Sequence, residues 1–214
     1  MQLIGMLDSP FVRRVAISLQ LLDLRFEHQS VSVFKTFPQF QQINPVVKAP
    51  TLVCSDGEVL MDSILILEYA EALSASVSGR SLVPSDLPGL QRSLRLTGLA
   101  MAACEKSVQI VYEHNLRPAE KLHEPWLERV TGQLHAAYDA LEMAYSESGT
   151  QLSSTSIDQA ALTTAVAWHF TQKMIPGTVD AAAYPALSAL SAAAEALPEF
   201  IAAPYGDSTY RHTV

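Results

Sequence analysis

The residue pair Ser9-Pro10 stands where a predicted helix begins and could bind a negatively charged group. A serine before a proline starts a helix well, because its hydroxyl accepts a hydrogen bond from a backbone N–H and proline fits the first helical position. The same helix start offers unpaired N–H groups and a partial positive charge to an anion. Ser9 is therefore either a helix cap only or a cap whose hydroxyl also faces a substrate.

Two further stretches carry groups that could recognise a small peptide-like ligand. In Lys48-Ala49-Pro50-Thr51-Leu52, a cis bond before Pro50 would turn the backbone of Ala49 outward to pair with an extended ligand, whereas a trans bond would make an ordinary turn. Asp62-Ser63 either caps the next helix or binds an amino-acid group, with Asp62 on the ammonium and Ser63 on the carboxylate. The residues alone leave both alternatives open.

The elements around these stretches alternate between strand and helix in the first 75 residues. A helix is predicted where apolar residues recur at helical spacing, and a hairpin where Asp56-Gly57 separates two apolar runs. The order is strand, helix, strand, helix, strand, strand, helix. The expected strands are 1–6, 25–33, 51–54 and 58–61, and the expected helices are 11–22, 38–43 and one that starts at Asp62.

The chain beyond this region shows helical patterns only. Ser74 to Pro88 is rich in serine and proline, which indicates a linker. Thr155 and Asp158 have the spacing of a capping box before an apolar helix. We therefore predict an α/β domain over 1–75, a linker over 76–87 and an all-helical domain over 88–214. The expected helices of the second domain are 90–115, 124–145, 155–171 and 184–197.

Composition excludes several classes of protein. The net charge of −8 argues against a nucleic-acid binder, which needs a basic face. The six histidines show no metal-ligand spacing, so we expect no metal site. Cys54 and Cys104 form no CxxC motif, which favours a reducing compartment. We see neither a membrane span nor a signal peptide and expect a cytoplasmic protein.

Taken in order along the chain, these motifs resemble those of the cytosolic glutathione transferase superfamily, with a serine-type, tau- or theta-like bacterial member as the nearest pattern. The resemblance runs through nearly the whole chain. It rests on Ser9–Val15, Asn44-Pro45 followed by Lys48–Leu52, Asp62–Tyr69, Thr155–Ala161 and Tyr184–Leu187.

The resemblance implies a thioredoxin-like first domain that binds glutathione, with Pro50 in the cis form. Carried over by position, the Ala49 backbone would pair with the cysteinyl part of glutathione, and Asp62 with Ser63 would hold the γ-glutamyl end. The glycyl carboxylate would meet Lys48 or Lys35, whose alignment is less certain. Phe11 would pack beside the site.

The resemblance also implies a glutathione transferase activity. Ser9 would hold the glutathione sulfur as a thiolate, which then adds to a small hydrophobic electrophile bound between the domains. On the predicted long helix, Met101, Cys104, Val108 and Tyr112 lie on one face, and Tyr112 is a candidate residue of the electrophile pocket. The family is usually homodimeric, so we expect a homodimer.

Two other functions stay open at this point. A glutathione-dependent thiol or peroxide reductase would normally carry a cysteine at the position of Ser9, because its mixed disulfide needs a protein thiolate. A non-catalytic module with the same fold would bind a protein partner instead. The serine at position 9 and the motifs around Pro50, Asp62 and Ser63 favour the transferase.

Overall fold

The computed structural model describes residues 1–147 and 152–210. The chain divides into two compact units, Met1–Leu82 with Ala196–Val214, and Val83–Glu195. The C-terminal segment thus belongs to the first unit, although the sequence had placed it with the helical domain. This segment returns to the first unit because a buried arginine on the first helix donates hydrogen bonds to its backbone.

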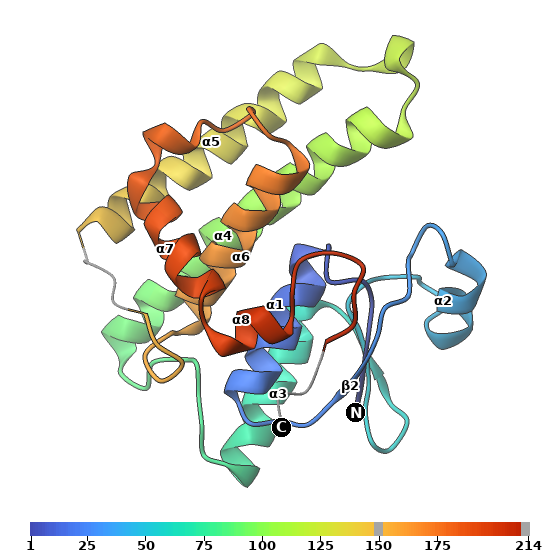
Figure 1. The fold of residues 1–214 in the computed structure, drawn as a ribbon, viewed down its shortest axis with the longest axis vertical. Coiled ribbons are helices and arrows are strands. Elements are labelled where there is room, and N and C mark those ends of the chain that lie inside the picture. The colour runs from blue at the N-terminus through green and yellow to red at the C-terminus, as the bar shows by residue number, and fades with distance from the viewer. Residues whose placement is uncertain (148–151, 211–214) are drawn as a thin grey trace. The chain divides into compact units, whose positions relative to one another are not determined.

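A four-stranded mixed sheet of order β2-β1-β3-β4 lies at the centre of the first unit (Figure 1). β1 (Gln2–Ile4) pairs with β2 (Glu27–Gln29) in parallel and with β3 (Thr51–Val53) antiparallel. β4 (Val59–Leu60) pairs antiparallel with β3. The predicted thioredoxin-like order of strands and helices is confirmed.

Four helices complete the first unit in the part of the chain that the structure describes. α1 (Pro10–Leu21) packs against α3 (Ser63–Val77) and α8 (Pro198–Ala202), and α2 (Phe37–Ile43) supplies Phe40 to a buried cluster with Ile4 and Val31. α1 is buried over almost its whole length, because both neighbouring helices and the sheet take its apolar residues from water. The start of α1, which carries Ser9, is therefore held in place by the packing of this helix.

The strands are shorter than the sequence suggested. β1 ends at Ile4 because Gly5 has a φ of +135°, a backbone conformation that suits glycine. The hairpin turn has the predicted position: Gly57 has a φ of +92°, and the Asp56 carboxylate accepts a hydrogen bond from the N–H of Glu58 at 3.1 Å. The predicted linker starts too early, because α3 continues to Val77 with Ser74 fully buried.

The second unit consists of helices in the described residues, as predicted. α4 (Leu87–Leu116) packs against α5 (Glu124–Ser146) and α6 (Gln159–Met174), and α7 (Pro185–Glu195) packs on α5 and α6 (Figure 1). Two short 3₁₀ turns, Ala119–Lys121 and Ala181–Ala183, lie between these helices. The predicted capping box is wrong: Asp158 itself caps α6 by accepting from the N–H of Ala161 at 2.8 Å, so the helix starts after it.

The C-terminal segment is held to the first unit by Arg13 of α1. This side chain is 1% exposed and donates from Nε to the carbonyl of Ala203 at 2.8 Å and from Nη2 to that of Phe200 at 3.4 Å. The guanidinium carbon also lies 5.6 Å from the centre of the Phe200 ring. A buried cation needs such partners, because its desolvation is costly. The residues after α8 therefore complete the environment of α1.

His28 on β2 holds the last described residue in place. Its Nε2 lies 2.7 Å from the carbonyl of Gly5, and its Nδ1 lies 3.0 Å from the backbone N of Tyr210. A carbonyl only accepts and an N–H only donates, so the ring is neutral with its proton on Nε2. Burial lowers the pKa of His28, although the hydrogen bond to Gly5 opposes this shift.

We expect His28 to make the stability of the protein dependent on pH below neutrality. Its pKa is lower in the folded state than in the unfolded state, so its contribution is complete above about pH 6.5 and is lost as the pH falls towards the folded value. The free energy of unfolding in urea, measured from pH 7.5 to 5.5, should fall less steeply for His28→Gln than for the parent. The slopes should differ by up to about 1 kcal/mol per pH unit, and parallel curves would contradict this role.

Candidate functional site

Ser9 is the N-cap of α1, as both interpretations of the sequence required. Its Oγ accepts a hydrogen bond from the N–H of Val12 at 3.4 Å, and its own N–H donates to the carbonyl of Met6 at 3.2 Å. Among the described residues, no group accepts the proton of the Ser9 hydroxyl. The cap and a second, donating role are therefore compatible, because a hydroxyl has one donor and two acceptor positions.

Charged residues of both signs lie near this helix start. Burial raises the pKa of Asp8, and so does the nearby Asp207, while the N–H of Ser9 and the positive charge of Lys35 lower it. Lys35 is exposed on a turn in which its N–H donates to the Ser32 hydroxyl at 3.0 Å. Phe11 is half-buried in the first turn of α1. The structure thus brings the charge of Lys35 near the residue that precedes Ser9.

The backbone of Ala49 is the clearest unused binding group in the first unit. The Ala49–Pro50 bond is cis, as the resemblance implied. Within the described residues, neither the N–H nor the C=O of Ala49 makes a hydrogen bond. Ala49 is half-buried, so part of this residue is open to solvent. An extended peptide-like ligand could supply both missing partners.

Gly5 places Ala49 next to α1. A Cβ atom on Gly5 would lie 2.6 Å from a methyl group of Val12 and 3.2 Å from the Cβ of Ala49. The first turn of α1 and the Ala49 segment therefore flank the end of β1 and come close to each other there. Sequence reasoning missed Gly5, and a glycine inside the expected strand 1–6 was the signal that could have found it.

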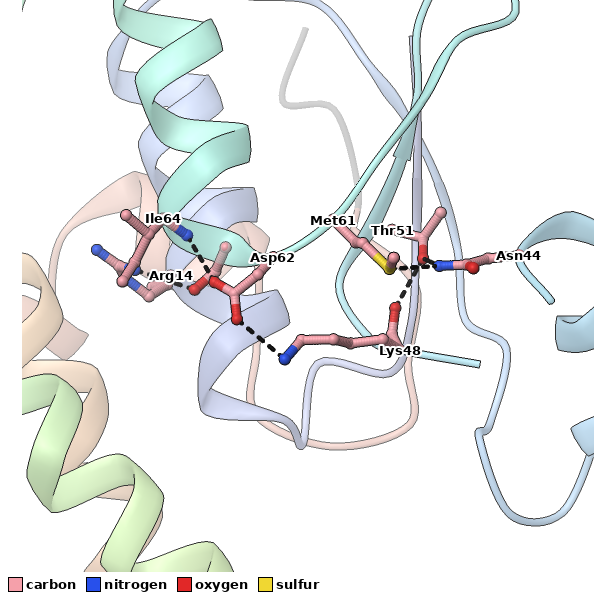
Figure 2. A network of polar contacts seen from close by, with 8 residues as sticks. Arg14, Asn44, Lys48, Thr51, Met61, Asp62 and Ile64 are labelled. Carbon is pink, nitrogen blue, oxygen red and sulfur yellow. Dashed lines mark hydrogen bonds and ion pairs between the residues drawn. The ribbon is translucent and has the colours of Figure 1, made fainter. Parts of the chain in front are cut away.

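Asp62 is the N-cap of α3 and also binds a lysine. One carboxylate oxygen accepts from the N–H of Ile64 at 2.9 Å, and the other lies 3.2 Å from Nζ of Lys48 (Figure 2). Burial opposes the charge on Asp62, but the N–H of Ile64, Lys48 and the nearby Arg14 together lower its pKa. Asp62 is thus a stable carboxylate that already holds one ammonium group.

Ser63 lies deeper than the sequence suggested. It is 0% exposed, and its hydroxyl accepts a hydrogen bond from Nη1 of Arg14 at 3.0 Å. Arg14 is itself 2% exposed on α1, so it ties the two helix starts together. Sequence reasoning missed Arg14; a charged residue inside an apolar helix pattern was the available signal. The role of Ser63 in binding a carboxylate stays a prediction, since a ligand reaches it only if neighbouring groups part.

The segment before Pro50 is fixed by a buried hydrogen-bond chain. The Thr51 hydroxyl donates to the carbonyl of Lys48 at 2.7 Å and accepts from the side-chain amide of Asn44 at 2.8 Å (Figure 2). Asn44 is 3% and Thr51 0% exposed. The backbone of Lys48 and Ala49 is therefore held firmly, while the Lys48 side chain remains half-exposed.

The predicted face of α4 in the second unit divides into buried and exposed residues. Cys104 is 0% exposed and belongs to the core of this unit, whereas Tyr112 is 43% exposed. Met101 and Val108 are intermediate. The assignment of Tyr112 to an electrophile pocket stays a prediction.

Other features bear on cofactors and redox chemistry. No group of three or more histidine, cysteine or acidic side chains that could hold a metal ion occurs in residues 1–147 and 152–210. In the same ranges, no helix is long and apolar enough to cross a membrane. Cys54 and Cys104 are buried and form no disulfide in the described part of the chain, and burial raises the pKa of Cys54.

The chain is similar to known proteins in sequence. Residues 3–78 match the family described as "Glutathione S-transferase, N-terminal domain". "Uncharacterized GST-like protein YibF" of Escherichia coli (strain K12) is 29% identical over 178 residues, which cover 83% of this chain and 86% of that protein. "Glutathione S-transferase U4" of Arabidopsis thaliana is 33% identical over 72 residues, so the match spans 34% of this chain and 32% of the plant protein.

The chain is also similar to solved structures. A glutathione transferase family member from Pseudomonas fluorescens Pf-5, crystallised with bound glutathione, superimposes with a TM-score of 0.79 and 29% identity. The superposition covers 94% of this chain and 97% of the other. It therefore extends over both units and not only the first.

Proposed function

Because the chain belongs to the cytosolic glutathione transferase superfamily, we propose that it binds glutathione on its first unit and transfers the tripeptide, through its sulfur, to a small hydrophobic electrophile. The observation that carries this proposal is the unpaired backbone of Ala49, which lies beside the first turn of α1. An extended peptide-like ligand would supply both partners. Detoxification in the cytoplasm is the corresponding biological role.

The proposed mechanism concerns the proton of the glutathione thiol. A thiol with a pKa of about 8.5 is mostly protonated at neutral pH, and lowering this value by about 2 units needs about 2.7 kcal/mol of preference for the thiolate. A hydrogen bond from a hydroxyl to an anion contributes about 1.5–3 kcal/mol. The start of α1 adds about 0.3–1 kcal/mol. Ser9 and the helix together meet the requirement, and the thiol proton passes to water.

The remaining binding groups follow from the same pose. The cysteinyl part pairs with Ala49 beside Pro50, and the γ-glutamyl ammonium binds Asp62. Ser63 and the N–H groups at the start of α3 bind the γ-glutamyl carboxylate. Phe11 packs against the ligand. The glycyl carboxylate meets Lys48 or Lys35, and the electrophile meets Tyr112. The half-buried or exposed state of all these residues except Pro50 and Ser63 supports this assignment.

The reductase alternative is disfavoured by the thiols of the chain. Position 9 is serine, and Cys54 is 9% exposed with a pKa that burial raises. A buried protonated thiol is a poor nucleophile for disulfide exchange.

A glutathione titration followed by turnover assays tests the proposal. Glutathione and S-methylglutathione should both bind in isothermal titration calorimetry with dissociation constants below the millimolar range. The protein should then accelerate the reaction of glutathione with 1-chloro-2,4-dinitrobenzene or another member of an electrophile panel. Absence of binding at millimolar glutathione would exclude the transferase function, whereas binding without turnover would leave a non-catalytic glutathione-binding protein.

We also propose that the protein forms a homodimer through α3. Large apolar side chains are exposed on and beside this helix, at Val59, Ile64, Leu65 and Tyr69, and Glu68 lies among them. The start of α4 in a second copy offers exposed leucines and an open pocket of about 270 Å³ lined by two arginines, which complements an apolar face carrying an acid. The residues on α4 are Leu87, Pro88, Gln91, Arg92, Leu94 and Arg95. In a two-fold dimer, each helix makes this contact once.

Sedimentation velocity tests the dimer with a matched pair of variants. The parent should sediment at twice the chain mass of 23.3 kDa. Leu65→Glu places a charge in the proposed contact and should give monomers. Met143→Glu changes an apolar residue on α5 that is even more exposed than Leu65 and should leave the dimer intact. A parent that sediments at the monomer mass, or equal behaviour of the two variants, would contradict the α3 interface.

A further inference from the structure

Without ligand, both oxygens of the Asp62 carboxylate already have partners. One accepts the hydrogen bond from the N–H of Ile64, and the other pairs with Nζ of Lys48 at 3.2 Å (Figure 2). The ammonium group of a ligand that binds Asp62 would meet Lys48 at this oxygen, where the two like charges repel each other. Lys48 thus stands in the ligand-free protein where the proposed function requires the γ-glutamyl ammonium.

The ion pair between Lys48 and Asp62 can break at little cost, which leaves both side chains able to bind other partners. The two side chains are 50% and 37% exposed, and an ion pair in contact with water contributes little to stability. The backbone of Lys48 is fixed through Thr51 and Asn44, but four flexible methylene groups separate it from the charge. The charged end of Lys48 can therefore move while its attachment point stays.

Asp62 keeps its negative charge during such an exchange. Arg14 and the N–H of Ile64 stabilise the carboxylate independently of Lys48. Binding therefore replaces one cation by another at Asp62 and needs no proton transfer. The displaced ammonium of Lys48 then needs an anion, and it starts one residue from Ala49, whose backbone holds the middle of the ligand in the proposed function.

We propose that Lys48 is a specificity-determining residue that exchanges partners on binding: it leaves Asp62 to the γ-glutamyl ammonium and moves to the glycyl carboxylate. This inference rests on the proposed glutathione site. It makes recognition of the two ends of glutathione interdependent. A ligand without the glycyl charge breaks the Lys48–Asp62 pair but offers Lys48 no new anionic partner. The affinity for such a ligand is therefore reduced by more than the loss of the glycyl contact alone.

A comparison of glutathione with its glycyl monoethyl ester tests the exchange. Lys48→Met should bind glutathione about fivefold more weakly than the parent, because the glycyl contact is lost. The same variant should bind the ester about threefold more tightly than the parent, because Asp62 is then free. In calorimetric titrations at one pH and salt concentration, Lys48→Met should therefore bind glutathione more weakly, and the ester more tightly, than the parent does.

Two controls separate the exchange from a general effect of charge. Lys48→Arg keeps a cation that can pair with Asp62 and should preserve the parent's preference for glutathione over the ester. Arg25→Met removes an exposed positive charge elsewhere in the first unit and should not strengthen ester binding.

The outcomes distinguish this inference from the proposed function. If the parent binds glutathione but Lys48→Met binds the ester no more tightly than the parent does, the exchange is wrong and the glutathione site stands. A lysine that meets only the glycyl carboxylate would leave ester affinity unchanged, and a purely structural lysine would weaken both ligands. If the parent does not bind glutathione at all, the proposed function and the exchange fail together.

Discussion

Ser9→Ala is expected to lower kcat/KM for conjugation about 100-fold while glutathione affinity changes by less than about twofold. The variant loses the hydroxyl proton that is unused in the described structure and that we assign to the thiolate, a hydrogen bond worth about 1.5–3 kcal/mol. The glutathione backbone would still pair with Ala49. The measurements are initial rates with 1-chloro-2,4-dinitrobenzene and a calorimetric titration. The pH profile of kcat/KM should also move to higher pH, because the bound thiol becomes a weaker acid.

The capping role of Ser9 requires a control. Removal of the hydrogen bond to the N–H of Val12 should itself cost about 1 kcal/mol of stability. Ser9→Thr keeps a hydroxyl and a cap and should retain most of the activity. Thermal denaturation of the parent and both variants shows whether each is folded at the assay temperature. Equal kcat/KM in the parent and Ser9→Ala would exclude a role for Ser9 in thiol activation.

Asp62→Asn is expected to weaken glutathione binding about tenfold with a much smaller effect on kcat at saturation. The asparagine can still accept from the N–H of Ile64, so α3 keeps its cap, but the charge that would bind an ammonium is gone. The expected loss of binding free energy is at the lower end of the range for hydrogen bonds to charged groups, because Asp62 is 37% exposed and water screens its charge. Calorimetry and the split between KM and kcat measure it.

Glu58→Gln is the matched control for this prediction. It removes one exposed negative charge from the same unit, at the hairpin and away from the Lys48–Asp62 pair. Its glutathione affinity should equal that of the parent. Asp62→Ala removes the cap as well and should combine weaker binding with lower thermal stability. Unchanged affinity in both Asp62 variants would contradict the assignment of the γ-glutamyl ammonium.

Features that depend on local backbone chemistry could be predicted from the sequence. The Asp56-Gly57 turn and the helix start at Asp62 follow from glycine at positive φ and from a side-chain cap, and both are present. The cis bond at Pro50 came only from the resemblance to the family, since spacing does not distinguish the two isomers. The capping box at Thr155 failed because Asp158 binds the N–H three residues ahead of it rather than behind.

Features that depend on contacts between distant residues could not be predicted. The Lys48–Asp62 pair joins two loops, and Arg14 reaches Ser63 across 49 positions in the chain. Neither contact produces a periodic pattern in the amino-acid sequence. Both change the interpretation of residues that the sequence analysis had proposed for the site: Asp62 already pairs with a cation, and the buried Ser63 accepts a hydrogen bond from Arg14. The motif gives the residue types of the site, but tertiary packing decides which of them are available to a ligand.

The bonds from Arg13 to Ala203 and Phe200 have a consequence for biosynthesis. The first unit contains the N-terminus, yet the carbonyl groups of Phe200 and Ala203 that bind its buried guanidinium lie 187 and 190 positions later. At about 5–20 residues per second, a ribosome needs roughly 10–40 seconds to synthesise that distance. Until then the nascent N-terminal half holds a cation without these acceptors, so we expect its folding to be completed only after α8 has been translated. Premature termination before residue 200 would leave an incomplete N-terminal half, although every residue of the candidate glutathione site had been made.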